Sequence, residues 1–399
     1  MNKLNELIQK LCPNGVEYKK LADCCALEKG NTPIQKAIPG EFPLVVTTEE
    51  RKSCNTYQFD KPTVCIPLVS SRGHGIASLN RLYYQEGKFA LGNILCGVTP
   101  VNSNELSAKF LFYYLNHKKD SLIVPLMRGG ANVSLTVDSL KRIIVPIPPI
   151  PVQNEIVHIF DKFEYLGNEL AAELTARKQQ YEHYRDKLLS FDTDSVNWLE
   201  LNEVIHSLNT GLNPRQFFRL NTEDATNYYV TIREIRGGRI VFTDKTDRIN
   251  DDALSLCNNR SNLEIGDVLF SGTGTIGETA VITKTPHNWN IKEGVYVIKP
   301  NQQYILSTYL RYLLTATHIK AAYMKKAAGG IVKSIPMGEL RKLSIPVPSI
   351  SEQNRIVKML GYFDFICNDP SSDLLAEIAA RQKQYEYYRD KLLTFKPLP

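Results

Sequence analysis

The segment RKQQYEHYRDKLLSF occupies residues 177–191, and a second segment, RQKQYEYYRDKLLTF, occupies residues 381–395. Eleven of their fifteen positions are identical. A segment that recurs this closely within one chain indicates an internal repeat, and a repeat restricts the folds that the chain can adopt. The likeness continues on the N-terminal side of both segments, so the repeating unit is much longer than fifteen residues.

A proline-rich block precedes each segment at a constant offset of 200 residues. It reads GGANVSLTVDSLKRIIVPIPPIPVQNEIVHIF at 129–160 and GGIVKSIPMGELRKLSIPVPSISEQNRIVKML at 329–360. Four extra residues around 368–371 then move the offset to 204. Weaker matches place 107–115 opposite 307–315, 63–79 opposite 267–282, and 16–30 opposite 196–211. The chain is therefore two copies of one unit, each a mixed domain followed by a helical tail.

The repeat divides the 399 residues into four parts, in agreement with a length that exceeds one ordinary domain. We expect a first head at 1–150, a central helical spacer at 151–194, a second head at 195–350 and a C-terminal helical spacer at 351–399. The tails agree closely and the heads diverge. This contrast predicts one kind of partner for both tails and a different target for each head.

Apolar and aromatic residues in both tails recur at steps of three or four, which is typical of long helices with a heptad-like seam. Pro151 suits a first helical position, and Ser351 suits an N-cap. Pro370 should interrupt the second tail, leaving a short helix at 351–367 and a long one from 371. Core packing is one explanation of the stripes. Matching stripes in one chain favour the other, an antiparallel coiled coil between copies related by a pseudo-two-fold axis.

Each head combines short β-branched runs with one helical pattern, so the predicted fold class is α+β with two tandem mixed domains. Strands are expected in the second head at 228–235, 239–243, 267–272, 278–284 and 293–300, with a helix at 307–327. The first head shows the same order at 42–48, 63–70 and 107–119. SGTGTIGE matches the spacing G-x-G-x-x-G, but a strand-like run follows it, which favours a hairpin over a dinucleotide site.

Positive charge is concentrated in the heads. Residues 1–150 hold 18 basic and 12 acidic side chains, and residues 195–350 hold 18 and 14, whereas the central helix at 151–194 holds 5 and 9. This distribution is consistent with heads that lie on phosphate and tails that do not. Two slightly basic globular domains would give the same balance.

The sequence contains no catalytic or metal-binding signature. Its eight cysteines form no C-x-x-C pair, which predicts free thiols in a reducing cytoplasm. There is no P-loop, no H-E-x-x-H and no paired Cys/His ligand set. The N-terminal stretch resembles neither a signal peptide nor a membrane span. We therefore expect a cytoplasmic protein without a catalytic site or a metal.

With these features the sequence resembles the specificity (S) subunits of Type I restriction–modification systems, and the likeness covers essentially the whole chain. The segments that carry it are the two proline-rich blocks, the two Y-x-x-YRDKLL-[ST]-F endings, VTIREI at 230–235 and GDVLFSGTGTIG at 266–277. The first head departs from this pattern, because PTVCIPLVSSRGHG stands where the second has the Gly-Asp hairpin.

The resemblance implies a non-catalytic subunit with two target-recognition domains, each reading one half of a bipartite site in double-stranded DNA. The helices would set the unread spacer and dock two methyltransferase (M) subunits. Those partners would carry S-adenosylmethionine and methylate adenine, so no cofactor is expected in this chain. Restriction (R) subunits would complete the nuclease complex, and no membrane is involved.

Candidate site residues follow from the chemistry of base reading, which favours Arg, Lys, Ser, Thr and amide side chains on loops. The predicted DNA contacts are Thr48, Arg51, Lys52, Arg72 and His74 in the first head, and Arg233, Arg236, Arg239, Lys245, Ser271, Thr273, Thr275, Lys325 and Lys326 in the second. The predicted partner contacts are Gln153, Tyr181, Arg185, Gln353, Tyr385 and Arg389. The sequence alone does not separate internal packing from partner contact for this last group.

Two other functions remain open at this level. A self-contained enzyme, such as a DNA methyltransferase or a nucleotide-dependent protein that uses GTGTIG, would bind S-adenosylmethionine or NAD on its own. A coiled-coil scaffold without a DNA role would show no sequence preference. A specificity subunit should instead show steep salt dependence and sequence preference, together with its methyltransferase.

Overall fold

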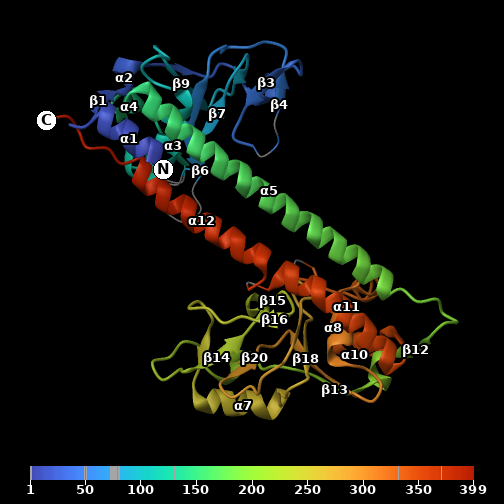
Figure 1. The fold of residues 1–399 in the computed structure, drawn as a ribbon. Coiled ribbons are helices and arrows are strands. Elements are labelled where there is room, and N and C mark those ends of the chain that lie inside the picture. The colour runs from blue at the N-terminus through green and yellow to red at the C-terminus, as the bar shows by residue number, and fades with distance from the viewer. Residues whose placement is uncertain are drawn as a thin grey trace. The chain divides into compact units, whose positions relative to one another are not determined.

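The computed structural model describes residues 2–48, 50, 52–71, 79, 81–129, 132–330, 332–369 and 371–399. The chain forms two compact units (Figure 1). Unit 1 comprises Met1–Glu169 with Ala379–Pro399, and unit 2 comprises Leu170–Ile378. Each unit therefore contains one head and helical segments from both copies of the repeat.

The first head is built on a four-stranded antiparallel sheet in the order β2-β9-β5-β7. A three-stranded sheet, β4-β3-β8, contains one parallel pair, and β6 pairs with β10. The strands are β2 Cys25–Lys29, β3 Phe42–Val45, β4 Lys52–Cys54, β5 Thr63–Pro67, β6 Val69–Ser71, β7 Tyr83–Gln85, β8 Ala90–Leu91, β9 Leu95–Pro100 and β10 Asn132–Ser134. The helices are α1 Asn2–Leu11, α2 Leu21–Cys24, η1 Ile34–Lys36, α3 Ala108–Leu122, η2 Val124–Leu126 and α4 Val137–Lys141.

The second head repeats this topology, with β13-β21-β18-β19 in one sheet and β17-β14-β20 in the other. It adds a hairpin of β15 and β16. The strands are β13 Ile205–Thr210, β14 Asn227–Val230, β15 Ile235–Arg236, β16 Arg239–Ile240, β17 Arg248–Ile249, β18 Val268–Ser271, β19 Thr279–Val281, β20 Trp289–Ile291 and β21 Val295–Pro300. The helices are η3 Leu201–Glu203, α6 Pro214–Phe217, η4 Ile232–Glu234, α7 Asp251–Ser261, α8 Ser307–Thr315, α9 Thr317–Met324 and α10 Met337–Arg341.

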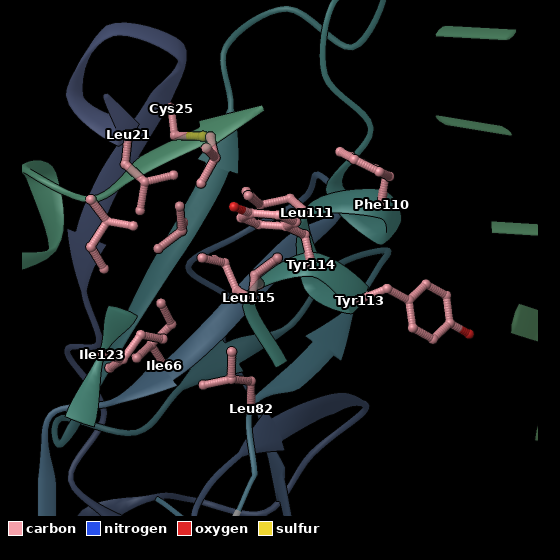
Figure 2. Close-up of a cluster of buried hydrophobic side chains, with 14 of the residues drawn as sticks. Leu21, Cys25, Ile66, Leu82, Phe110, Leu111, Tyr113, Tyr114, Leu115 and Ile123 are labelled. Atoms are coloured by element: carbon pink, nitrogen blue, oxygen red, sulfur yellow. The ribbon is translucent and has the colours of Figure 1, made fainter. Parts of the chain in front are cut away.

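The core of the first head lies between α3 and the four-stranded sheet. Figure 2 shows Phe110, Leu111, Tyr114 and Leu115 of α3 within the cluster that contains Leu21 and Ile66. Tyr113 belongs to the same buried cluster, but its ring is directed away from the other labelled side chains, and its hydroxyl donates a hydrogen bond to Asp161, 2.7 Å away. One face of α3 thus fills the head, and a residue on its other side reaches the tail helix.

The proline-rich blocks form an edge strand followed by the start of a tail helix. In the first copy β11 Ile144–Ile147 pairs with β1 Glu17–Lys20, and in the second β22 Ser344–Val347 pairs with β12 Asn197–Glu200. Both ladders are antiparallel. Proline is tolerated there because such two-stranded ladders leave one edge unpaired.

The tails form three helices, α5 Ile150–Leu188, α11 Ile350–Asn368 and α12 Asp373–Leu392. The predicted break in the second tail is confirmed, although α11 and α12 have similar lengths of 19 and 20 residues. Pro370 itself lies outside the described residues. The prediction of Ser351 as N-cap was wrong, because Ser349 caps α11 by accepting the Glu352 N–H. Pro151 occupies the second position of α5, not the first.

The helices of the two copies pair within each unit. In unit 2 Tyr184 contacts Phe363, while Cys367, one helical turn further along α11, lies near Lys178, so these segments run antiparallel. In unit 1 the end of α12 packs beside the start of α5, again antiparallel (Figure 1). The predicted antiparallel pairing of the tails is therefore confirmed inside each unit.

Three details of the heads differ from the sequence prediction. The helix expected at 307–327 is two helices, α8 and α9, because Ala316 between them is extended. The head helices α3 and α8 align at an offset of 199 residues, not at the predicted 200. The turns before them show this, because the Leu106 N–H donates to the Asn102 carbonyl in the first head and the Ile305 N–H donates to the Asn301 carbonyl in the second. The loop before α8 is thus one residue shorter, and α7 was not foreseen.

Candidate nucleic-acid interface

The segment 231–247 of the second head carries four of the predicted DNA contacts. It begins with a capping box in which the Glu234 carboxylate accepts hydrogen bonds from the Thr231 N–H and hydroxyl, 2.8 and 2.7 Å away. Glu234 is buried, so this carboxylate fixes the approach to the hairpin. The hairpin then turns at Gly237 and Gly238, with φ of 54° and 76°, which glycine adopts readily.

Two of the four cations are paired, one with a residue of the head and one with a residue of the tail. The Arg233 guanidinium lies 2.6 Å from the Asp247 carboxylate, and that of Arg239 lies 2.6 Å from Asp369. Both side chains remain about half exposed, at 53% and 54%. Each can therefore still meet a phosphate or base, in competition with its carboxylate.

The other two cations lie on the surface of the same segment. Arg236 is exposed, and its Nε donates to the Arg233 carbonyl, 2.7 Å away. Lys245 is exposed in the turn that follows the hairpin. An exposed guanidinium on a fixed hairpin is well suited to a phosphate or a guanine edge.

Hydrogen bonds fix the position of Asp369, the partner of Arg239. Its carboxylate accepts hydrogen bonds from the Ser371 hydroxyl and backbone N–H, at 2.6 and 2.9 Å. These bonds, followed by Arg239, lower the pKa of Asp369 to about 2. The group therefore stays ionised throughout the physiological range.

A set of aromatic rings beside the hairpin was missed by sequence reasoning. Tyr228 stacks on Phe242 with ring centroids 4.3 Å apart, Phe242 meets Trp289, and the Arg248 guanidinium lies over Tyr228. Phe242 and Trp289 border a hollow of about 690 Å³ between the hairpin and α8, whose rim includes Lys284. The three aromatics come from separate strands and loops, so no local sequence pattern could reveal the cluster.

The glycine-rich segment is the predicted hairpin, with β18 and β19 antiparallel. Thr273 and Thr275 are exposed on its loop. Ser271 differs from this prediction because it is fully buried, and its hydroxyl donates to the Thr275 carbonyl and accepts the Glu278 N–H. Its side chain shapes the loop and is not accessible from the surface.

The remaining basic candidates are dispersed. Lys325 and Lys326 are exposed after α9, and Lys326 lies 3.6 Å from Glu339. In the first head Thr48 and Lys52 are exposed and border a small hollow together with Arg81, which stacks over Tyr83. The predictions for Arg51, Arg72 and His74 lie outside the described residues.

The two predicted glutamines of the tails are internal. Gln153 and Gln353 are fully buried at equivalent positions. Gln353 accepts the Leu306 N–H and donates to the Tyr304 and Pro348 carbonyls, and Gln153 makes the same set of bonds in the first copy. Each amide joins head, proline-rich block and tail helix. Of the two explanations left open by the sequence, the structure shows internal packing for this pair.

The predicted tyrosines and arginines lie at the border between core and surface. Tyr181 and Tyr385 are half-buried against the cores of unit 2 and unit 1. Arg185 stacks over Tyr181 and hydrogen-bonds to the Thr317 hydroxyl, whereas Arg389 pairs with Asp390. Their inner faces thus attach each tail to the head of the other copy, and only their outer faces are open to a partner.

An exposed apolar face on α11 was not among the predicted partner contacts. Met359, Tyr362 and Phe365 are 41%, 66% and 43% exposed and recur every three residues. A run of large exposed apolar side chains on one helix is typical of an interaction surface. Other apolar residues between them, such as Leu360 and Phe363, hid this face within the long amphipathic pattern.

The described residues include no group of three or more His, Cys, Asp or Glu side chains able to hold a metal ion. All eight cysteines are buried and free. Of the helices that the structure describes, none is sufficiently long and apolar to cross a membrane.

Comparison with known proteins identifies the family. The family model described as "Type I restriction modification DNA specificity domain" matches residues 13–177 and again 195–380. The chain belongs to this family of Type I restriction–modification specificity subunits. The two matched segments fall on the two copies of the repeat, as expected for tandem target-recognition domains.

Individual members of the family resemble this chain over most of its length. The Escherichia coli EcoR124I/EcoR124II specificity subunit is 32% identical over 310 residues, which cover 75% of this chain and 73% of that protein. The specificity subunit S.HindORF215P of Haemophilus influenzae is 32% identical over 341 residues, 82% of each. The crystal structure of the S subunit from M. genitalium has the same fold, with a TM-score of 0.57 over 95% of both chains at 16% identity.

Proposed function

We propose that each head of this specificity subunit reads one half of a bipartite DNA site. The supporting observation is that the two heads repeat one strand order but differ in the elements they add. Head 2 carries the β15–β16 hairpin with exposed Arg236, and α7, on the common framework. Two similar frameworks with unlike surfaces are suited to two unlike half-sites.

The chemistry of the complex would then belong to other subunits. We propose that two M subunits bring S-adenosylmethionine and methylate adenine, and that R subunits add the nuclease. The family resemblance supports this division, since the relatives named above are specificity subunits. This chain would contribute DNA recognition and assembly without a catalytic residue.

The helices are proposed to dock the M subunits. Their inner faces are occupied by the heads and by each other, as Tyr181 and Tyr385 show. The exposed face formed by Met359, Tyr362 and Phe365 is the strongest candidate for a docking contact in unit 2. A helix of the M subunit with an apolar face would cover it.

The decisive experiment is a binding selection on random duplex DNA with this chain co-purified with its M subunit. Two short motifs separated by a fixed, unread gap are expected. A single short motif would overturn the assignment of two readers. No enrichment at all would favour the scaffold role.

The spacer assignment has its own test. The tail of copy 1 is one continuous helix, α5, which contributes 150–169 to unit 1 and 170–188 to unit 2. Inserting about one heptad into α5, and a matching heptad into the second tail, should lengthen the unread gap and leave both motifs unchanged. An unchanged gap would show that the helices do not set the spacer.

A further inference from the structure

Two features of the second copy have no counterpart among the described residues of the first. One is the β15–β16 hairpin, which forms a separate two-stranded sheet between β14 and β17 along the chain. The other is the break between α11 and α12, whose equivalent region in the first copy lies within the uninterrupted helix α5. If these two features of the second copy contact each other, they can act together in one function.

The two features do meet, at the turn of the hairpin. Besides the Arg239–Asp369 ion pair, Gly237 lies against Asn368, where an added Cβ would stand 3.2 Å from the Asn368 Cβ. A Cβ on Gly238 would lie 1.8 Å from the Arg311 guanidinium. Arg311 is itself buried and paired with Asp364 of α11 at 2.5 Å. The hairpin turn is thus closely packed against the tail helix.

Local hydrogen bonds at the break between α11 and α12 fix the position of the Asp369 side chain. The Ser371 hydroxyl and N–H hold its carboxylate, and the buried Ser372 hydroxyl donates to the Ile366 carbonyl, 3.1 Å away. The Asp369 side chain is only 15% exposed although it lies outside any helix. Such a preorganised acceptor loses little side-chain freedom when it binds its arginine.

The opposite end of the hairpin is also fixed. Arg233 is held by Asp247, and Glu234 is buried in its capping box. Arg236 stands between these two anchors, exposed at the surface. The position of the Arg236 side chain relative to bound DNA therefore depends on the contacts that fix both ends of the hairpin, Arg239–Asp369 and Arg233–Asp247.

We propose that Asp369 is a positioning residue for DNA reading by head 2. It holds Arg239, and through it the hairpin turn, so that Arg236 is presented to the DNA in one place. This inference rests on the proposed function and extends it: a residue of the tail, outside the head itself, contributes to the choice of one half-site.

The test is a double-mutant cycle in the complex of the full chain with its M subunit. The variants are Asp369→Ala, Arg239→Ala, their combination, and Asp369→Glu. Asp373→Ala, which removes an exposed carboxylate from the first turn of α12, serves as the control. Each is measured by binding selection and by affinity for the selected site, with a thermal melt to monitor folding.

Both single variants should relax base preference in the head 2 half-site and weaken binding by about fivefold, the upper range for one partly exposed ion pair. The double variant should lose no more than either single variant, because the two residues act as one unit. Asp369→Glu should restore most of the preference. The other half-site and the Asp373→Ala control should be unchanged.

Two results would overturn the inference. If the Asp369→Ala variant selects the same motif with the same affinity as the parent, the ion pair does not position the hairpin for DNA reading. A double variant much weaker than Asp369→Ala would show that Arg239 contacts DNA itself. The parent complex is measured first, and if it selects no bipartite motif the proposed function fails, and this inference with it, before any variant is considered.

Discussion

Tyr184 stacks on Phe363 with ring centroids 5.2 Å apart and ring planes 23° from parallel. Phe163 and Tyr388 form the equivalent pair in the other unit, at 5.7 Å and 32°. In both cases a tyrosine from the repeated tail segment of one copy meets a phenylalanine in the first half of the other copy's tail. The likeness of the two segments is therefore explained by two equivalent surfaces that they must fit.

Removing one ring should destabilise one unit and leave the other intact. We expect Tyr184→Ala to lower the free energy of unfolding of unit 2 by about 2 kcal/mol, since it removes a half-buried ring and its stacking contact with Phe363. Tyr388→Ala should do the same in unit 1. Hydrogen exchange resolved by residue would measure both effects. Tyr387→Ala is the control, because this ring is 60% exposed on the same helix.

The buried amide of Gln353 should be more important than its small size suggests. Gln353→Ala leaves the Leu306 N–H and the Tyr304 and Pro348 carbonyls without this partner, which should cost about 1–3 kcal/mol. Chemical denaturation would measure the loss. Asn354→Ala removes a neighbouring exposed amide and should change little. Equal losses in the two variants would contradict the internal role.

The stability of unit 2 should fall as the pH is lowered below about 6.5. Burial lowers the pKa of His318 below its ordinary value of 6.5; Asp186 opposes this shift and Arg185 adds to it. The Nε2 atom of His318 is buried without a hydrogen-bond partner. Because the unfolded chain binds the proton more tightly, stability is full above pH 6.5 and declines toward the folded-state pKa.

A substitution isolates the contribution of this histidine. His318→Gln should flatten the decline of unit 2 stability between pH 7 and pH 5, measured by hydrogen exchange at several pH values. His183→Gln, at an exposed position of α5, should leave the decline unchanged. If His318→Gln follows the parent at every pH, the decline has another origin.

Arg236 should contribute to only one half of the DNA site. Arg236→Ala is expected to reduce base preference at one or two positions of the half-site read by the second head. The loss of discrimination against the wrong base should be about 1–3 kcal/mol, the range for a guanidinium bound to a base edge. Binding selection would reveal the change. Arg260→Ala, which removes an exposed cation from the end of α7, should leave the motif intact. Changes in both half-sites would contradict the assignment.

The exposed face of α11 should be required for assembly. Tyr362→Ser combined with Phe365→Ser is expected to weaken M subunit binding at least tenfold without loss of stability, since large exposed rings often dominate an interface. Titration of the M subunit followed by calorimetry would measure it. Tyr304→Ser removes a ring that is 51% exposed in head 2, and should not affect assembly.

The repeat, the helical tails and the class of the heads could be predicted because they depend on local patterns. The hairpin at 271–279 and the break near Asp369 were also visible, since glycine and proline mark turns and helix ends. The N-cap was misplaced by two residues because Ser349 and Ser351 are both good caps, and only the backbone decides between them.

The site was less predictable because its parts are joined by tertiary contacts. Nothing local distinguishes Arg239, paired with a residue 130 positions away, from Arg236, which remains exposed. Ser271 lies among exposed threonines in sequence but is turned inward by the loop that it closes. The aromatic cluster around Phe242 is likewise assembled from residues that are distant along the chain.

The exchange of tails between copies also determines the order in which the protein can fold during synthesis. Unit 1 contains residues 379–399, so its head emerges from the ribosome long before the segment that completes its core. Buried Leu392 and Leu393 arrive last. Until then the first head exposes apolar surface that a chaperone or a neighbouring chain can cover. Unit 2 is one continuous stretch, Leu170–Ile378, so it can finish folding first, and the second head to be made should be the first to become stable.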